Sequence, residues 1–394
     1  MLHERHKNTI EIIIVGGGMI GAALASGLSQ HGFEVVVLEA ASPPIFNPLS
    51  YPDLRISAIT AASVSLLKKI GVWPRVLIMR CAPYRTQEIW EYQIARVIFN
   101  AQSLGLSELG YMVENHVLKY ALSQQLYTQS VPIFYNTRLI DLQKRKDYWN
   151  LILNNGKNLQ ARLVVGADGA YSQVRQLVNI TWYSWRYAQS CLLISVYCSY
   201  NPGDSTWQQL TPSGPRAFLP LFGRWALLVW YDEPAQLHRL QSLTMSQLQK
   251  EIQRHFPSRV GKVNPLATTT LPLYRSHAKH YILSGLALVG DAAHTLHPLA
   301  GQGVNLGYRD VSALITVLRE AREHSDQWAS IEVLQRYQEK RQKDNYLMQN
   351  GIDLLNLTFS HTCLPFTMVR NLGFIIANHA GKLKKDMLSY GLGL

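Results

Sequence analysis

A cluster of glycines lies between a run of β-branched residues and a run of small apolar residues near the start of the chain. Residues 10–15 predict a buried parallel strand, residues 19–31 a helix and residues 33–39 a second strand. Between the first strand and the helix stands Gly16-Gly17-Gly18-Met19-Ile20-Gly21. A chain that passes from strand to helix through Gly-x-Gly-x-x-Gly is constrained to a strand–helix–strand unit whose turn faces a ligand.

The residues of this turn have separate tasks in dinucleotide binding. Gly16 permits the tight turn, Gly18 lets a pyrophosphate approach the backbone, and Gly21 lets the helix pack on the strand. Glu39, at the end of the second strand, can accept hydrogen bonds from both ribose hydroxyls of an adenosine. A carboxylate there disfavours a 2′-phosphate, so the unit predicts FAD or NAD and not NADP. The alternative is a glycine turn with a purely structural role.

A second motif follows a predicted strand–turn–strand at residues 149–163. It reads Gly166-Ala167-Asp168-Gly169 and continues to Arg175, with Ser172 near the start of a predicted helix. Its carboxylate stands at the tip of a strand. Taken alone, this pattern fits a cofactor contact and an ordinary strand-to-helix turn equally well.

A third motif begins at Gly290-Asp291 and continues through Pro298 to Gly301-Gln302-Gly303-Val304-Asn305. Asp291 follows a short buried strand, where its carboxylate could bind the ribitol hydroxyls of FAD. The glycines allow backbone to approach a flat ring. The predicted helix 302–323 directs its positive end at that place, which would stabilise an anionic reduced flavin.

A metal site competes for the same segment. Asp291-x-x-His294-x-x-His297 offers ligand types at plausible spacing, and His277-x-x-His280 offers a second pair. The chain contains no Glu-x-x-His, so the helical di-iron arrangement is excluded. The glycines of this segment favour flavin, and we expect no metal.

Composition limits the remaining classes. Apolar residues make up 47% and charged residues 16%, which is typical of a globular chain. The net charge of +12 comes from scattered Lys and Arg without a nucleic-acid-binding signature, so we expect no nucleic-acid partner. The four cysteines are widely spaced and form no Cys-x-x-Cys motif, which fits a protein of a reducing cytoplasm. No membrane-spanning segment is expected.

The middle of the chain has a different pattern of apolar and turn-forming residues. Residues 190–231 hold alternating strand-like runs between Pro and Gly turns, which predicts an antiparallel sheet inserted into the nucleotide-binding domain. Helices are expected at 57–71, 114–129 and 244–256, and the last sixty residues are expected to be mostly helical.

With the three motifs in this order, the chain resembles the class A flavoprotein monooxygenases, which have the p-hydroxybenzoate-hydroxylase-like fold. Within that group it is similar to the ubiquinone-biosynthesis hydroxylases, on segments 53–59, 111–115 and 290–305. Segments 188–191 and 202–209 resemble the branch that acts on demethoxyubiquinol. The resemblance extends over nearly the whole chain.

This resemblance implies an α/β fold with an α+β insertion: a Rossmann-like FAD-binding domain interleaved with an antiparallel-sheet substrate domain, plus C-terminal helices. The expected FAD-binding domain is discontinuous, at 1–80, 105–185 and 280–345. The substrate domain is expected at 81–104 and 186–279, and the C-terminal helical region at 346–394.

The resemblance also implies a reaction. NADPH or NADH reduces FAD, O2 adds at flavin C4a, and the resulting hydroperoxide hydroxylates the ring of a polyprenylated benzoquinol. The reductant would bind transiently, since the chain has no second Gly-x-Gly-x-x-Gly unit. The alternatives are hydroxylation at another ring position, a flavin reductase acting on a polyprenyl lipid, and a non-catalytic FAD-binding assembly protein.

The implied site residues follow the motifs, and no catalytic base is identified. The expected cofactor contacts are Gly16, Gly18, Gly21, Glu39, Arg55, Asn115, Asp168, Gly169, Arg175, Gly290, Asp291, Pro298, Gly301, Gly303 and Asn305, with Gln302 also near the isoalloxazine. The substrate candidates on the inserted sheet are Arg216, Phe218, Pro220 and Trp230.

The implied substrate also suggests partners and a location. A polyprenyl tail has to come from a bilayer or from another enzyme of ubiquinone biosynthesis. We therefore expect a cytoplasmic protein with a peripheral contact at the inner face of the membrane. Apolar residues and lysines between Phe374 and Leu388 are the candidate contact, and a C-terminal helix docked on its own domain is the alternative.

Overall fold

A computed structural model describes residues 9–92, 95–297, 301–360 and 364–394. Its first layer is an eight-stranded sheet built around β1 (Thr9–Val15), which pairs in parallel with β2 (Val35–Leu38) and β11 (Asn158–Gly166). The strand order is β17-β18-β11-β1-β2-β8, and β10 and β9 extend it from β11. The outer strands are β8 (Ile133–Phe134), β9 (Leu139–Lys144), β10 (Trp149–Leu153), β17 (Ile282–Leu283) and β18 (Leu286–Leu288).

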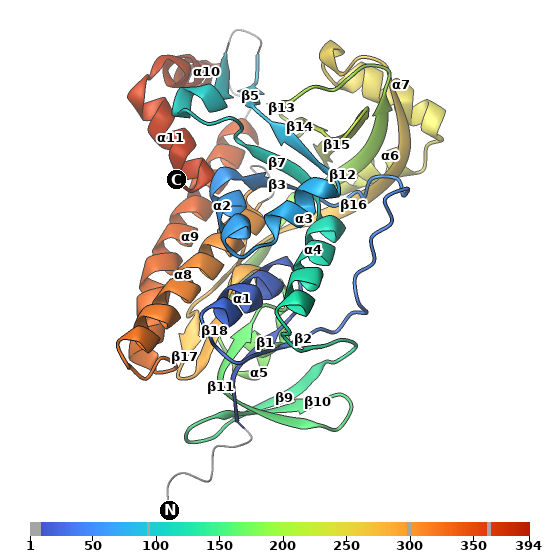
Figure 1. Ribbon diagram of the computed structural model, residues 1–394. Coiled ribbons are helices and arrows are strands. Elements are labelled where there is room, and N and C mark those ends of the chain that lie inside the picture. The colour runs from blue at the N-terminus through green and yellow to red at the C-terminus, as the bar shows by residue number, and fades with distance from the viewer. Residues whose placement is uncertain (1–8, 93–94, 298–300, 361–363) are drawn as a thin grey trace, which may run out of the picture.

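Three helices lie side by side over this sheet (Figure 1). They are α1 (Met19–Gln30), α4 (Asn115–Thr128) and α8 (Gly303–Glu323), and short α5 (Gln173–Leu177) follows β11. The strands of the sheet centre are apolar at every position that they bury, because helices or loops cover both faces.

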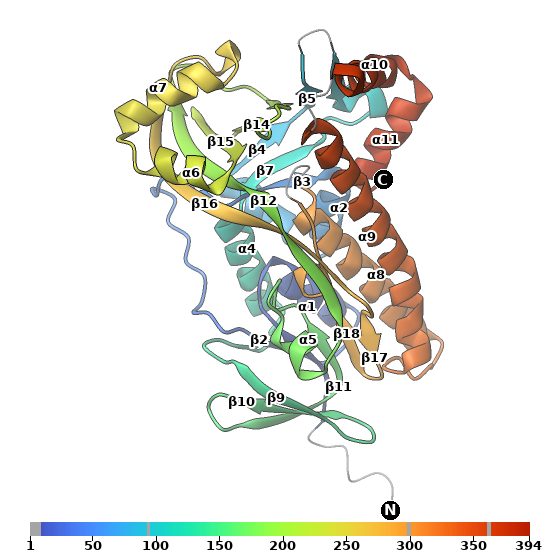
Figure 2. The same cartoon turned by 180° about the vertical axis from the view of Figure 1, so that it is seen from behind.

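A second eight-stranded sheet has the order β19-β16-β12-β15-β14-β13-β5-β6. Two long strands, β12 (Trp182–Cys198) and β16 (Val263–Ala278), form an antiparallel ribbon that runs from the first sheet into the second (Figure 2). The others are β5 (Thr86–Trp90), β6 (Arg96–Asn100), β13 (Ser205–Gln209), β14 (Arg216–Pro220), β15 (Trp225–Asp232) and β19 (His294–Thr295).

The outer face of this large sheet is covered by α6 (Pro234–Gln241) and α7 (Met245–His255). Thr244 and Gln247 form a capping box at the start of α7, which explains why the helix begins there. The inner face turns towards a three-stranded sheet of β3 (Ile56–Thr60), β7 (Gly110–Glu114) and β4 (Cys81–Tyr84).

The chain ends in three helices, α9 (Ile331–Ser360), α10 (Leu364–His379) and α11 (Lys382–Leu392). The remaining helices are α2 (Ala61–Lys69) and α3 (Trp73–Ile78), with 3-10 turns at Ala101–Leu104, Ser258–Val260 and Gly290–Ala292.

Two expectations need correction. The helix expected at 57–71 begins only at Ala61, because Ile56–Thr60 alternate between the two faces of a strand that pairs with β7. The boundary expected between residues 345 and 346 falls inside α9, which continues without a break to Ser360.

Candidate functional site

The glycine turn between β1 and α1 is packed too tightly for side chains at two of its positions. A Cβ at Gly16, where φ is +105°, would lie 2.4 Å from the carbonyl oxygen of Ala167. A Cβ at Gly21 would lie 1.9 Å from the carbonyl oxygen of Gly16. At Gly18, by contrast, nothing lies within 4 Å of the Cβ position. Gly16 and Gly21 therefore serve packing, whereas the space at Gly18 is open to a ligand.

The start of α1 is suited to an anion. Gly18 is the N-cap and gives no side-chain cap, and the first turn has no acidic residue. The free N–H groups of the first turn of α1 therefore point into the open space at the positive end of the helix. Glu39 stands beside this turn, where its carboxylate accepts hydrogen bonds from the N–H of Gly17 at 2.6 Å and of Ala41 at 2.7 Å. Glu39 is only half-buried, so lone pairs remain for ribose hydroxyls.

The second motif adjoins the first, since Ala167 N–H donates to the carbonyl of Val15 at 2.8 Å. One carboxylate oxygen of Asp168 caps α5 by accepting from the N–H groups of Gln173 and Val174 at 2.7 and 3.1 Å. The other oxygen, Oδ1, is buried and has no hydrogen-bond partner within the described part of the chain. A buried acceptor without a partner is costly, so Oδ1 is suited to a donor on a ligand.

Arg175 joins the second motif to the third. Its guanidinium is buried and donates to the carbonyl of Ala292 at 2.7 Å and to that of Ala170 at 2.8 Å. It also lies 4.2 Å from the centre of the Trp182 ring. Burial lowers the pKa of Arg175. The sequence prediction made Arg175 a cofactor contact, but its Nη1 and Nη2 groups are used within the protein, so we assign it a positioning role.

The third motif begins directly after β18. Gly290 has φ +60°, and the next residue, Asp291, is exposed and accepts no hydrogen bond through its carboxylate from the residues that the structure describes. Gly301 also has a left-handed φ of +61°, and neither Gly303 nor Gly169 has an atom within 4 Å of its Cβ position. Pro298 lies outside the described residues.

Two side chains at the start of α8 differ in what they offer. The Oε1 of Gln302 is buried and has no partner among the residues placed by the structure. Asn305 is fully engaged: its Oδ1 accepts from Thr60 and Ser63, and its Nδ2 donates to the carbonyls of Ala58 and Gly301. Asn305 therefore ties the third motif to β3, and we assign it a positioning role in place of a direct contact.

Arg55 and Asn115 are brought together at one end of the three-stranded sheet. The N–H of Asn115 donates to the carbonyl of Arg55 at 2.9 Å, and its Oδ1 accepts from Ser57 Oγ at 2.7 Å. The Arg55 side chain is exposed, so it is available to a bound cofactor.

The substrate candidates on the large sheet do not meet the glycine motifs. Phe218 and Trp230 lie in the outer core beneath α6 and α7, and Trp230 packs edge-on against Phe256. Arg216 is buried in an ion pair with Asp232 at 3.0 Å. Side chains alternate between the faces of a strand, so Arg216, Phe218 and Pro220 share a face. The residues turned inwards are their neighbours.

The inner face is apolar and ends at the third motif. It includes Cys191, Leu193, Ala217, Leu221, Leu227, Val229 and Tyr231. The Tyr231 ring stacks on His297 with centroids 5.7 Å apart, and the Tyr187 ring meets His297 edge-on at 4.6 Å. Burial lowers the pKa of His297 to about 4, so this ring is neutral at pH 7. Sequence reasoning missed this trio, because only the strand register shows which face turns inwards.

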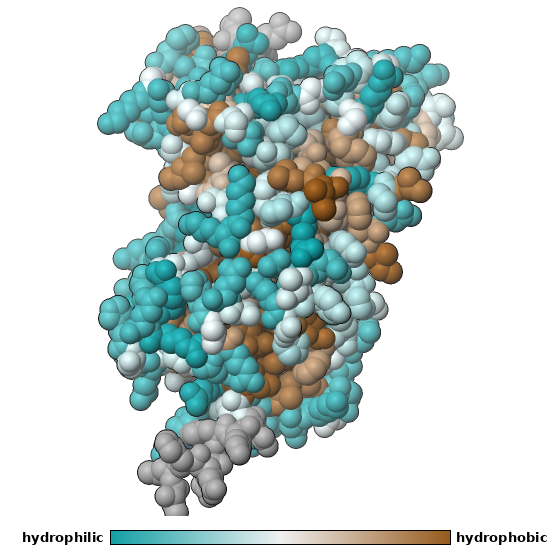
Figure 3. Space-filling model, viewed as in Figure 1, coloured by the Kyte–Doolittle hydropathy of each residue, from teal (hydrophilic) through white to brown (hydrophobic). Residues whose placement is uncertain are grey.

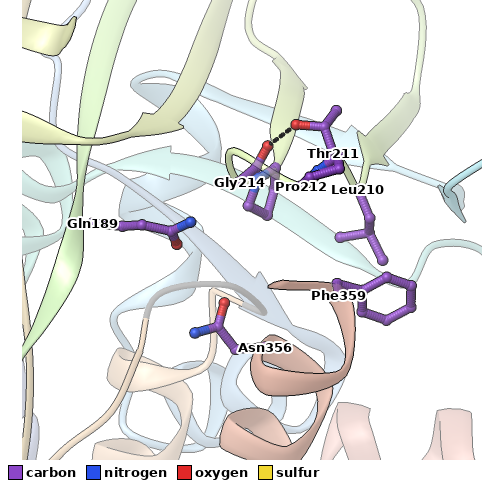
Figure 4. A pocket seen from close by; sticks show the side chains of 8 residues that line it. Gln189, Leu210, Thr211, Pro212, Gly214, Asn356 and Phe359 are labelled. Atoms are coloured by element: carbon purple, nitrogen blue, oxygen red, sulfur yellow. Dashed lines mark hydrogen bonds between the residues drawn. The ribbon is translucent and has the colours of Figure 1, made fainter. Parts of the chain in front are cut away.

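A separate small pocket lies where α9 meets the large sheet (Figure 4). Its walls come from Gln189 on β12, from the segment between β13 and β14, and from Asn356 and Phe359 on α9. Thr211 Oγ1 donates to the carbonyl of Gly214 at 2.6 Å and holds that segment closed. No residue of the three glycine motifs lines this pocket, so we regard it as a small gap in the packing of α9 on the large sheet.

Two of the histidines weighed as metal ligands have protein partners. His294 Nε2 lies 2.6 Å from Asp310, and His277 Nδ1 lies 2.8 Å from the Oε1 of Gln349. In the described ranges, no group of three or more His, Cys, Asp or Glu side chains converges as metal ligands would.

The donor and acceptor groups fit FAD. An uncapped helix start faces open space at Gly18, and the Glu39 carboxylate stands beside it. The unpartnered Asp168 oxygen and the exposed Asp291 carboxylate follow along the carboxyl ends of β11 and β18, where α/β sheets bind their ligands. We propose that these residues hold the pyrophosphate, the adenosine ribose and the ribityl chain.

Comparisons with known proteins also indicate an FAD-binding protein. The FAD binding domain family matches residues 9–346. The 3-demethoxyubiquinol 3-hydroxylase of Escherichia coli K12 is 58% identical over 98% of both chains. The mitochondrial ubiquinone biosynthesis monooxygenase COQ6 of Danio rerio is 31% identical over 98% of this chain and 92% of its own. The crystal structure of p-nitrophenol 4-monooxygenase PnpA from Pseudomonas putida DLL-E4 has a TM-score of 0.81 at 19% identity and covers 98% of each chain.

The family match and the 58% identical relative thus define the chain as an FAD-dependent monooxygenase, a class that uses NAD(P)H as its reductant. The chain belongs to the ubiquinone-biosynthesis hydroxylase family of these enzymes.

Proposed function

We propose that this protein hydroxylates the ring of a polyprenylated demethoxybenzoquinol, with NAD(P)H and O2 as co-substrates. The observation that carries the proposal is the 58% identity over 98% of both chains with the 3-demethoxyubiquinol 3-hydroxylase. The COQ6 monooxygenase of Danio rerio has about half this sequence identity to the chain, at 31%. This difference favours the demethoxybenzoquinol over another ring position.

The chain's own residues have two tasks in this reaction. The apolar inner face from Cys191 to Tyr231 excludes water from the ring, which protects a reactive oxygen species from loss to solvent. Neutral His297 and the two tyrosines around it give that face a polar end without a charge. FAD, when bound, supplies the electron transfer and oxygen activation. A quinol is already activated by its own hydroxyls, so the reaction requires no dedicated base.

The test is a product analysis. Purified enzyme with FAD should oxidise NADPH or NADH faster when a demethoxyquinol analogue is present, and the product should be one oxygen atom heavier. Cells without the protein should accumulate the demethoxy intermediate, as measured by mass spectrometry of their quinones. Accumulation of a different intermediate would assign another ring position, and reduced product without added oxygen would assign a flavin reductase.

We further propose that the enzyme meets its substrate at a bilayer surface. A polyprenyl tail is far too apolar to move through water, since each buried CH2 contributes about 0.8 kcal/mol. The structure contains no described helix with the length and apolarity to cross a membrane. Support for surface contact comes from α10, where Met368, Leu372, Ile375 and Ile376 share one face and are all exposed.

The last helix extends this apolar face. Leu383 and Met387 on α11 are exposed, whereas Leu388, named with them from the sequence, turns inwards into the core. Lys382 and Lys385 are exposed beside them, and Lys384 instead donates to Asn378 at 2.8 Å. Figure 3 shows apolar side chains gathered on the side of the molecule that α10 and α11 occupy. An apolar face beside cations is typical of contact with an anionic leaflet.

The double variant Lys382→Glu/Lys385→Glu should reduce co-sedimentation with anionic vesicles by at least about thirtyfold, since each cation near such a surface contributes about 1 kcal/mol and each replacement also adds repulsion. The matched control is Lys250→Glu/Lys262→Glu, which changes the same charge on exposed lysines near α7. Equal binding of both double variants would show that α11 is not the membrane contact.

A further inference from the structure

Asp310, on α8, is completely buried and yet lies at the centre of a polar cluster. Its Oδ2 accepts from the N–H of Gly290 at 3.0 Å and from Nε2 of His294 at 2.6 Å. Its Oδ1 accepts from Nε of Arg341 at 2.8 Å and from Nδ2 of Asn345 at 3.2 Å. An ionised carboxylate only accepts hydrogen bonds, so Nε2 of His294 carries a proton here.

The charge on Asp310 is held by its neighbours. Burial by itself would raise the pKa of this carboxyl, but the charges and hydrogen bonds of His294 and Arg341 hold the pKa well below its usual range. The carboxylate is therefore ionised at any physiological pH. A buried ion is expensive unless it is paired and fully hydrogen-bonded, and Asp310 meets both conditions.

The donors to Asp310 come from two places with different roles. Arg341 and Asn345 belong to α9, far from the glycine motifs in sequence. Gly290 and His294 belong to the turn that carries Asp291, and Arg175 holds the same turn from its other side through Ala292.

We propose that Asp310 is a positioning residue for FAD. Its carboxylate fixes the peptide N–H of Gly290, and the next side chain, Asp291, is thereby held on the open side of the turn without a partner among the described residues. Asp291 can then accept the ribityl hydroxyls without first reorganising. Such preorganisation raises affinity by lowering the ordering cost of binding. A role limited to packing α8 on α9 would leave FAD affinity unchanged.

The experiment is a double-mutant cycle on FAD dissociation constants, measured by quenching of FAD fluorescence on binding to apoprotein. Asp291→Ala and Asp310→Asn should each weaken FAD about ten- to hundredfold, the range for loss of a charged hydrogen bond. If Asp310 acts through Asp291, combining the two substitutions should add little. The dissociation constant of the double variant should then exceed that of the weaker-binding single variant by a factor of about three at most. Additive losses would overturn the proposal.

Two further variants keep the test decisive. Asn345→Ala removes one donor to Asp310 from α9 and should weaken FAD by a few fold in a protein that still folds, which covers the case in which Asp310→Asn does not fold. Glu91→Gln is the matched control, since Glu91 is a buried carboxylate bonded to Arg370 at 2.8 Å in another part of the fold. A lower melting temperature with unchanged FAD affinity in Asn345→Ala would also overturn the proposal.

Discussion

The variant Gly18→Val should fold but purify without flavin, whereas the wild-type protein should be yellow with non-covalent FAD. The Cβ position at Gly18 has nothing within 4 Å, so the protein itself accommodates a side chain there. The same space lies at the start of α1, where a pyrophosphate would receive N–H groups. Losing two charge-assisted hydrogen bonds, at about 1.5–3 kcal/mol each, corresponds to a fall in FAD affinity of more than about a hundredfold.

Two companions separate ligand exclusion from misfolding. Gly351 is exposed on α9 and also has nothing within 4 Å of its Cβ position, so Gly351→Val should bind FAD normally. Gly21→Ala would place a Cβ 1.9 Å from the Gly16 carbonyl oxygen and should lower the melting temperature of the apoprotein. Retention of FAD by Gly18→Val, measured from the absorbance spectrum after dialysis, would refute the assignment of the glycine turn.

The variant Arg175→Met should lower the free energy of unfolding by about 3 kcal/mol or more, because two buried carbonyls lose charged donors at about 1.5–3 kcal/mol each. Those carbonyls belong to Ala170 and Ala292, which lie in different motifs. The loss should appear in urea unfolding of the apoprotein, and FAD affinity should fall with it because the turn carrying Asp291 loses one clamp.

Arg186→Met is the matched control for this substitution. Arg186 is exposed on β12, and its guanidinium lies 5.9 Å from the centre of the Tyr274 ring. A surface change of this kind should alter the free energy of unfolding by no more than about 0.5 kcal/mol. Equal stability of the two variants would mean that Arg175 does not join the motifs.

The cofactor half of the proposed site could be inferred from the sequence because its chemistry is local. A strand, a glycine turn and a helix within forty residues determine where a pyrophosphate can bind, and Gly16, Gly18 and Glu39 stand where the pattern placed them. The carboxylates of the second and third motifs could be proposed as cofactor contacts for the same reason, since each follows directly on a strand.

The substrate half was not predictable because it depends on register. Phe218 and Leu219 are adjacent in sequence and point to opposite faces of one sheet, and only the pairing with β15 decides which of them turns inwards. The partners of Asp310 were hidden for a related reason: they lie 16 to 35 positions away in the chain, and they meet only because α8 packs both on α9 and on the turn that carries Asp291.

The central position of β1 has a consequence for how the protein is made. This strand is synthesised before the other strands of its sheet, but it pairs with β11, whose far edge pairs with β18, and its covering helix α1 packs against α8. At about 5–20 residues per second, synthesis of the intervening chain takes tens of seconds. From the synthesis of β11 until β18 emerges, the nascent sheet has an unpaired apolar edge at β11, which is a template for wrong pairing. The inserted sheet between residues 182 and 278 contains its own ribbon of β12 and β16 and can form meanwhile. Folding yield should therefore depend on chaperone protection of the amino-terminal third until the last parallel strand has emerged.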